Sequence, residues 1–295
     1  MKRTLLSTLL FLLFLAGCAQ PTSTPLEHKV SSTCLYYSQQ RAECLTQEQF
    51  MQILKPYKVI FVGDHHDSMA SRAVLLEIIE EMAAAGDHVI LANEWFTPED
   101  DPLLQQYVEG KLDDNISKAL GWKKRVGYDF NLSEPIYSKV ISVGGELKGI
   151  NLSKTFKKKI SDANVSGMSD AEKEFYKALD LNVTAHKQML SPFFQHCHGD
   201  AQQSAQVCAE RMYRVQVAWD TKMALESAKL ASKLKEHERL IVFVGAMHLE
   251  QKLGINLRFS RLSQAPFITI IPWQKGSGAF EMIDHGSSDI DYLYP

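Results

Sequence analysis

Two stretches of the chain end in the same way: KVIFVGDHH at residues 58–66 and LIVFVGAMH at residues 240–248. Each is an apolar run that stops at a glycine and places a histidine three residues later, His66 in the first and His248 in the second. An apolar run of about five residues predicts a strand that is buried on both faces, as in a parallel sheet flanked by helices. Ligands of such sheets bind beyond the carboxyl ends of the strands, so we expect both histidines at a functional site.

Helix and strand patterns alternate through the first half of the chain. Residues 68–85 carry apolar side chains at helical spacing, and strands are expected at residues 88–92 and 147–150. These two strands deliver Glu94 and Asn151 beyond their carboxyl ends. The alternation predicts a mainly parallel sheet with helices on both of its faces.

A helical section of about residues 155–237 interrupts the alternation. A capping box opens a helix that is expected over residues 169–190, and residues 201–237 are expected to form one very long helix or two abutting ones. The alternation resumes with the second quoted strand and ends with a strand at residues 266–271. The predicted fold class is therefore α/β, a mainly parallel sheet flanked by helices, with a helical insertion.

The first residues have the pattern of an export signal. A positive start and a short apolar run end in Leu-Ala-Gly-Cys, which resembles the bacterial lipobox and predicts that Cys18 carries lipid, including palmitate. We expect a lipoprotein signal peptide at 1–17, a lipidated flexible tether at 18–30 and a single α/β domain at 31–295. Ala19 resembles the sorting position of outer-membrane lipoproteins, which predicts a lipid-anchored protein on the periplasmic face of that membrane. The alternative is an ordinary signal peptide with a chance cysteine.

The net charge and the number of cysteines limit which binding partners and which disulfides are expected. Loss of Lys2 and Arg3 with the signal peptide takes the formal net charge from −3 to −5, which favours neither nucleic acid nor an anionic membrane surface as a partner. An even number of cysteines remains, and an exported protein is expected to oxidise them. The expected disulfides are Cys34 with Cys44 and Cys197 with Cys208, although other pairings stay open. A metal or haem site is the alternative for the second pair, because His196 and His198 flank Cys197.

The residues at the strand ends suit a metal ion. His66, Glu94 and His248 combine two imidazoles and a carboxylate, a set that fits Zn²⁺, Fe²⁺ or Mn²⁺ with positions left for water or substrate. His65 is an alternative to His66, and Asp64 and Asn151 are expected to support the ligands. In the competing interpretation the histidines cap helices or bond backbone carbonyls. Glu94 then pairs with an arginine, with these candidates: Arg72, Arg211 and Arg214.

These motifs, taken in order, resemble those of the ChaN family. ChaN proteins are bacterial haem-binding lipoproteins of iron uptake, in a superfamily with the Tiki metalloproteases and erythromycin esterases. The resemblance spans about residues 45–265 and rests on both G-x-x-H motifs, the carboxylate and asparagine at strand ends, a His-Cys pair, and Gln216-x-x-x-Asp220. It implies haem bound between two protomers, with a tyrosine on the iron and polar side chains of the partner protomer on the propionates.

Three positions depart from the family pattern. Asp64 stands where relatives more often carry glutamate, and Trp219 stands where they carry arginine. An aromatic hydroxyl expected near Ser133 is missing. If the resemblance holds, the iron ligand is therefore either a histidine or one of three tyrosines: Tyr128, Tyr137 or Tyr213.

Other residues fit a haem site. Phe193 and Phe194 provide an apolar wall next to His196, unless they only close a disulfide loop onto the core. Gln216 and Asp220 are four residues apart and share a helix face, where they point at the sheet or form a solvated pair.

The predicted function is that of a haem-binding lipoprotein of bacterial iron uptake. It captures or relays haem at a crevice between strand ends and a dimer interface, with a homodimer and an outer-membrane haem receptor as partners, and without catalysis. The expected haem-binding residues are His65, His66, Glu94, Asn151, Tyr137, His196, Tyr213, Gln216, Asp220 and His248. The alternative is a metal-dependent hydrolase in which His66, Glu94 and His248 bind a divalent metal and Glu94 acts in catalysis.

Overall fold

The structure of the chain is a computed structural model that describes residues 33–112, 115–194, 204–274 and 287–295. The described residues belong to one compact unit, Thr33–Pro295. The expected signal peptide and the whole of the expected tether, with Cys18, lie outside them. None of the helices in these ranges combines the length and the apolar character that a bilayer span requires.

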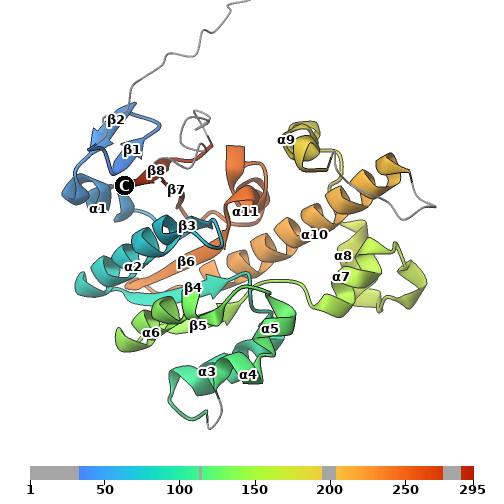
Figure 1. Cartoon of the computed structure of the whole chain (residues 1–295), viewed down its shortest axis with the longest axis horizontal. Coiled ribbons are helices and arrows are strands. Elements are labelled where there is room, and N and C mark those ends of the chain that lie inside the picture. The colour runs from blue at the N-terminus through green and yellow to red at the C-terminus, as the bar shows by residue number, and fades with distance from the viewer. Residues whose placement is uncertain (1–32, 113–114, 195–203, 275–286) are drawn as a thin grey trace, which may run out of the picture. The chain divides into compact units, whose positions relative to one another are not determined.

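An eight-stranded mixed sheet forms the centre of the unit, in the order β2-β1-β8-β7-β3-β6-β4-β5 (Figure 1). Strands β3 to β8 run parallel to one another wherever they pair, and β1 pairs antiparallel with β2 and with β8. The strands are β1 Tyr36–Ser38, β2 Glu43–Leu45, β3 Val59–Asp64, β4 His88–Asn93, β5 Glu146–Gly149, β6 Glu238–Gly245, β7 Phe267–Gln274 and β8 Ile290–Tyr294. The predicted α/β fold class is confirmed.

Eleven α-helices are present within the described residues. They are α1 Gln47–Leu54, α2 Met69–Ala84, α3 Asp101–Val108, α4 Ile116–Ala119, α5 Trp122–Arg125, α6 Glu134–Ser142, α7 Lys154–Ser161, α8 Asp170–Lys177, α9 Thr184–Phe194, α10 Ala205–Ala231 and α11 Ile255–Leu262. Helices α7 to α10 lie between β5 and β6 in the chain, and α7, α8 and α9 gather along α10 at one side of the molecule (Figure 1).

The central strands are apolar because helices cover both faces of the sheet. All six residues of β3 are buried, and their side chains alternate between the faces. Ile60 and Val62 pack in the cluster that contains the apolar face of α2, whereas the Phe61 ring lies 5.3 Å from that of Phe259 in α11. The quoted apolar run is therefore a strand with a hydrophobic layer on each side.

The helix expected over residues 169–190 is broken in two. Helix α8 ends at Lys177, and α9 begins at Thr184. Between them the Asp180 side chain accepts a hydrogen bond from the backbone N–H of Asn182 and pairs with Arg261 of α11. Aspartate side chains compete with helical hydrogen bonding in this way, so the single long helix was the wrong prediction.

The edge of the sheet that holds β1, β2 and β8 was not predicted. Strand β8 contains the charged residue Asp291, so its sequence lacks the continuous apolar run that predicts a buried strand. Asp291 is nevertheless buried, and it accepts hydrogen bonds from Trp273 and Ser288. The predicted disulfide between Cys34 and Cys44 is present and ties the β1–β2 hairpin. Cys208 is buried, and its predicted partner in the second disulfide lies outside the described residues.

Candidate functional site

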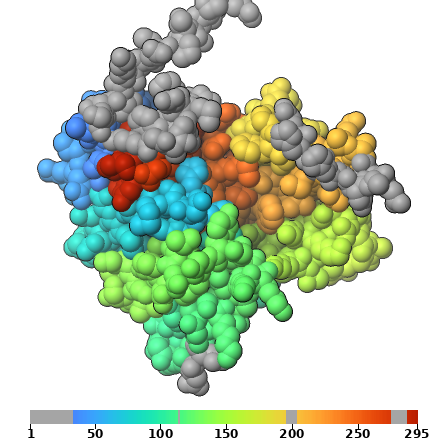
Figure 2. All heavy atoms as spheres, viewed as in Figure 1, coloured from blue at the N-terminus to red at the C-terminus, as the bar shows by residue number. Residues whose placement is uncertain are grey.

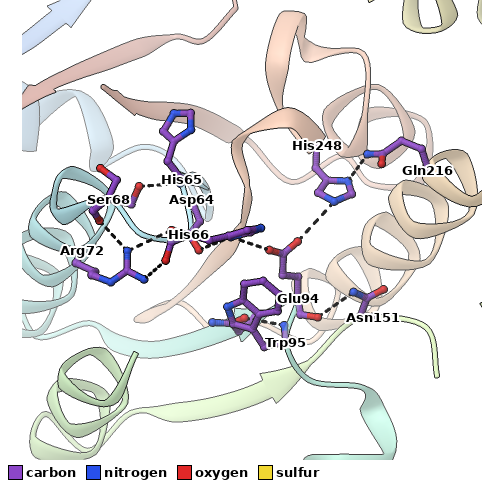
Figure 3. A network of polar contacts seen from close by, with 12 residues as sticks. Asp64, His65, His66, Ser68, Arg72, Glu94, Trp95, Asn151, Gln216 and His248 are labelled. Carbon is purple, nitrogen blue, oxygen red and sulfur yellow. Dashed lines mark hydrogen bonds and ion pairs between the residues drawn. The ribbon is translucent and has the colours of Figure 1, made fainter. Parts of the chain in front are cut away.

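The carboxyl ends of four neighbouring parallel strands, β3, β6, β4 and β5, lie side by side. Strand β6 lies between β3 and β4, and β5 pairs with the far side of β4. The pairing register sets Asp64 opposite Gly245 and sets Asn93 opposite both Phe243 and Gly149. The residues that follow these ends therefore converge, and Figure 3 shows His66, Glu94, His248 and Asn151 together.

A glycine makes the convergence possible. A Cβ atom at Gly245 would lie 3.3 Å from His66 Cε1, 3.4 Å from His248 Cδ2 and 3.5 Å from Glu94 Oε1. The end of β6 thus faces the three side chains, and a larger residue would fill the space that they share. Gly245, which ends the apolar run in the sequence, therefore leaves the space between these three side chains free in the fold.

Two carboxylates lie near the same ring nitrogen of His66. Its Nδ1 lies 2.9 Å from Asp64 Oδ2 and 3.8 Å from Glu94 Oε1. The other oxygen of Asp64, Oδ1, lies 3.7 Å from Arg72 Nη1. Candidate metal-ligand atoms of Asp64, His66 and Glu94 all lie within 4.8 Å of one another. These three residues offer the donor types that divalent metals bind.

His248 is held from the long helix. Its Nδ1 lies 2.5 Å from Asp220 Oδ1, and its Nε2 lies 3.6 Å from Glu94 Oε2. A carboxylate on Nδ1 places the proton there and leaves Nε2 to face Glu94. The Gln216 amide group also lies 2.8 Å from Nδ1.

The network continues into the interior through Asp220. Asp220 is fully buried, and its Oδ2 lies 3.4 Å from Nε2 of the fully buried His186 and 3.9 Å from Arg258 Nη1. Arg258 also donates to the backbone carbonyls of Leu253 and Gly254. Burial lowers the pKa of His186, so the buried charge of the carboxylate is compensated by Arg258 and by His248, whose pKa is raised.

The pKa values of His66, His248 and Glu94 are all raised above their ordinary values. Burial lowers the pKa of His66 and of His248, but the facing carboxylates outweigh it and raise both above the ordinary value of 6.5. Burial raises the pKa of Glu94 above 4.5, although His248 and His66 oppose the shift. Shifts of this kind collect at functional sites because one environment must hold several ionisable groups.

Several predicted residues take other positions. His65 points away from Glu94 (Figure 3), and its ring centroid lies 5.3 Å from that of Trp273. Asn151 donates through Nδ2 to the Glu94 backbone carbonyl at 2.9 Å, so it supports the loop that carries Glu94. His196 lies outside the described residues, while Phe193 is exposed on α9.

The three candidate tyrosines are placed differently. Tyr137 is in the core, where its hydroxyl accepts a hydrogen bond from Asn93. Tyr213 is also buried, and its hydroxyl donates to the backbone carbonyl of Val183. Tyr128 is 42% exposed. Of the three, Tyr128 alone has the exposure that a large external ligand requires.

Tyr128 belongs to an aromatic surface beside the strand-end site. Its ring centroid lies 5.0 Å from that of His66 and 5.9 Å from that of Trp95, and the His66 and Trp95 rings are 4.5 Å apart. Trp95 directly follows Glu94 in the chain, so its place near the site followed from the strand pattern. We call Tyr128, Trp95 and His66 the aromatic face. A flat aromatic ligand can stack on such a surface.

Glu94 does not pair with an arginine among the described residues, so that interpretation was wrong. Its carboxylate faces His66 and His248. Arg72 instead holds the turn after β3, where it donates to the backbone carbonyls of Ser68 and Leu132. Gln216 and Asp220 are buried and face His248, so they are not a solvated pair.

Comparisons with known proteins identify a family and a similar fold. The model of a family described as haem-binding uptake, Tiki superfamily, ChaN matches residues 50–259, which is more than half of the chain. Among solved structures the chain is similar to ChaN of Campylobacter jejuni, whose structure is described as one of cofacial haem binding. The TM-score is 0.69, with 16% identity over 88% of this chain and 96% of that chain. At this identity the similarity shows the fold.

A second structural match is weaker. An erythromycin esterase mutant, EreC in its open conformation, matches with a TM-score of 0.45 and 11% identity over 82% of this chain and 78% of that chain. A similarity at this level supports no argument about function. The comparison with curated protein sequences finds no match.

Proposed function

The chain belongs to the ChaN family of haem-binding uptake proteins in the Tiki superfamily, and from this premise we propose that it binds haem on the aromatic face. The observation that carries the proposal is the exposed phenol of Tyr128 packed beside His66 and Trp95. A haem site needs apolar or aromatic walls and one axial donor, and tyrosine is among the residues that hold haem iron. In this proposal Tyr128 supplies the donor.

The fit of haem can be tested against the residues present. The rings of Trp95 and His66 offer a wall next to the donor, and the side chain of His66 is 29% exposed. Behind them, Asp64 and Glu94 fix the orientation of the His66 ring. The chain therefore contains a wall, a donor and a support for the wall, and haem would supply only its own iron chemistry when bound.

The proposed role is uptake by a lipid-anchored carrier rather than turnover. The lipobox supports an anchor at Cys18, and the aromatic face is open to solvent at Tyr128, which supports exchange of haem with a receptor or a second copy. ChaN of Campylobacter jejuni is described as binding haem cofacially. We infer for this chain a homodimer in which two aromatic faces meet over the haems.

The test is a titration of the mature protein with hemin, followed by absorption and by sedimentation. A saturable Soret band together with a shift from monomer to dimer supports the proposal. An absorption that grows linearly with hemin, like that of free hemin, contradicts it.

A second candidate, binding of a divalent metal, is favoured by one specific observation. Asp64 Oδ1 and Glu94 Oε1 are buried and have no hydrogen-bond partner within the described part of the chain, and both belong to the cluster with His66. A cation would satisfy these oxygens. Metal analysis of the purified protein tests this: a stoichiometric ion that is lost from the His66→Ala/His248→Ala double variant supports the site, and a metal-free wild type speaks against it.

A further inference from the structure

A cavity of about 480 Å³ opens directly beside the strand-end site. It shares Glu94, Trp95 and Asn151 with that site and extends to α5, to the start of α7 and to Trp219 of α10. In the space-filling view the green residues of α5, the yellow-green residues of α7 and the orange residues of α10 lie next to one another (Figure 2). The cavity is therefore a continuation of the proposed haem site.

Basic side chains outnumber acidic ones in the lining of the cavity, with Lys124, Arg125, Lys154 and Lys157 against Glu94 and Asp100. Lys124, Lys154 and Lys157 line it, and in the part of the chain that the structure describes none of the three forms an ion pair with a carboxylate. The ammonium group of Lys154 donates to the backbone carbonyl of Lys124, which holds the two lysines together. Arg125 differs because Asp100 neutralises it, with Nη1 2.9 Å from Oδ1.

Two further features favour an anion that is attached to an aromatic body. The Lys157 ammonium lies 5.4 Å from the ring centroid of Trp219, and Trp95 lines the cavity on the side of the aromatic face. Helix α7 begins at Lys154 after the Ser153 cap, and the first turn of a helix carries a partial positive charge. Three uncompensated ammonium groups and this helix end attract negative charge into a space with indole walls.

We propose that this cavity binds the propionate carboxylates of the porphyrin within a single protomer, through Lys124, Lys154 and Lys157. The inference rests on the proposed haem function and extends it. The family resemblance implied polar side chains of a partner protomer at the propionates, whereas here the chain that carries Tyr128 also carries the cations. Tyr128 would then hold the iron, Trp95 would contact the porphyrin ring, and the lysines would bind its carboxylates.

The test uses metal-free protoporphyrin IX, which has the two carboxylates and no iron. Binding is measured from quenching of tryptophan fluorescence, because Trp95 and Trp219 line the cavity. The Kd of the Lys154→Met/Lys157→Met variant is expected to rise by about tenfold or more, since two charge-assisted contacts are lost. The dimethyl ester of the porphyrin is expected to bind the wild type and this variant equally.

The matched control is Lys158→Met/Lys177→Met, which removes two lysines whose side chains are 77% and 69% exposed and which form only local surface ion pairs. Its Kd for protoporphyrin IX is expected to stay at the wild-type value. The Lys154→Arg/Lys157→Arg variant keeps both charges and is expected to recover most of the affinity, which separates loss of charge from misfolding.

The outcomes separate this inference from the haem proposal. Failure of wild-type protein to bind protoporphyrin IX, or equal affinity in the wild type and the Lys154→Met/Lys157→Met variant, overturns the carboxylate site. Hemin binding that depends on Tyr128 would survive either result. Conversely, charge-dependent binding of the iron-free porphyrin supports the cavity even if the iron has no ligand at Tyr128.

Discussion

His248 Nδ1 lies 2.5 Å from Asp220 Oδ1, and both side chains are buried. The contact joins the end of β6 to the middle of α10, which are 28 residues apart in the chain. It fixes which nitrogen of His248 carries the proton and directs Nε2 toward Glu94. The long helix therefore orients a residue of the site as well as covering the sheet.

Asp220→Asn is predicted to lower stability more at low than at high pH. Asp220 and Glu94 raise the pKa of His248 above 6.5 against the effect of burial. A raised histidine pKa adds stability that is fully present below the unfolded value and is lost as pH rises through the folded value. In chemical denaturation, the free energy of unfolding of the variant should be about 1–3 kcal/mol below that of the wild type near pH 6, and the difference should be smaller near pH 9.

Asp180→Asn is the control for this experiment, because it removes a carboxylate from a half-exposed pair with Arg261. The free energy of unfolding of Asp180→Asn should fall by less than about 1 kcal/mol. If Asp220→Asn lowers the free energy of unfolding equally at both pH values, the aspartate does not stabilise a protonated His248.

Gly245→Ala is predicted to separate the two candidate ligands. The added Cβ would occupy the space between His66, Glu94 and His248, at 3.3–3.5 Å from their atoms. Calorimetry with Zn²⁺ should show loss of any stoichiometric metal binding, while hemin affinity should stay within about twofold, a free-energy change of under 1 kcal/mol.

Gly63→Ala is the matched control, since its Cβ would meet Ala246 at 3.2 Å instead of the three site residues. If Gly245→Ala weakens hemin together with the metal and Gly63→Ala does not, the iron lies between the histidines rather than on the aromatic face.

Removal of the Cys34–Cys44 disulfide should destabilise the β1–β2 edge. The bond closes a loop of ten-residue separation, for which the chain-entropy model gives about 2–3 kcal/mol. Thermal unfolding of Cys34→Ser/Cys44→Ser is expected to show a lower Tm. An unchanged Tm would indicate that pairing of β1 with β8 already holds the edge.

Cys18→Ser is predicted to release the protein from the membrane fraction. The lipobox predicts lipid on Cys18, and a lipid anchor holds a protein to the bilayer through its buried acyl chains. Fractionation and mass spectrometry of the mature N-terminus check this. Wild-type protein that is found in the soluble fraction with an unmodified Cys18 refutes the anchor.

The meeting of His66, Glu94 and His248 was predictable from the sequence. Each follows an apolar run, and parallel strands end at a common edge, so only the strand order was undetermined. The partner of His248 was harder to predict. The i, i+4 spacing of Gln216 and Asp220 shows that they share a helix face, but it does not show which strand end that face contacts.

The aromatic face and the lysine cavity required the tertiary structure. Tyr128 lies between α5 and the next short helix, in a segment without strand or helix periodicity, so nothing in its neighbours indicates that its ring reaches His66. Lys124 and Lys157 are likewise 33 positions apart in the sequence and meet only because α5 and α7 line one cavity. Contacts between segments that are far apart in the chain depend on packing and leave no local signal in the sequence.

The most direct test of the account is a hemin titration of the wild type beside Tyr128→Phe and Tyr213→Phe. The two variants each lose one hydroxyl, but that of Tyr213 is buried against the Val183 carbonyl, away from the aromatic face. The account predicts a saturable Soret band for the wild type and Tyr213→Phe. For Tyr128→Phe it predicts an altered spectrum and an affinity that is weaker by at least about tenfold. A Tyr128→Phe protein that keeps the wild-type spectrum and affinity would contradict the assignment of the haem to the aromatic face.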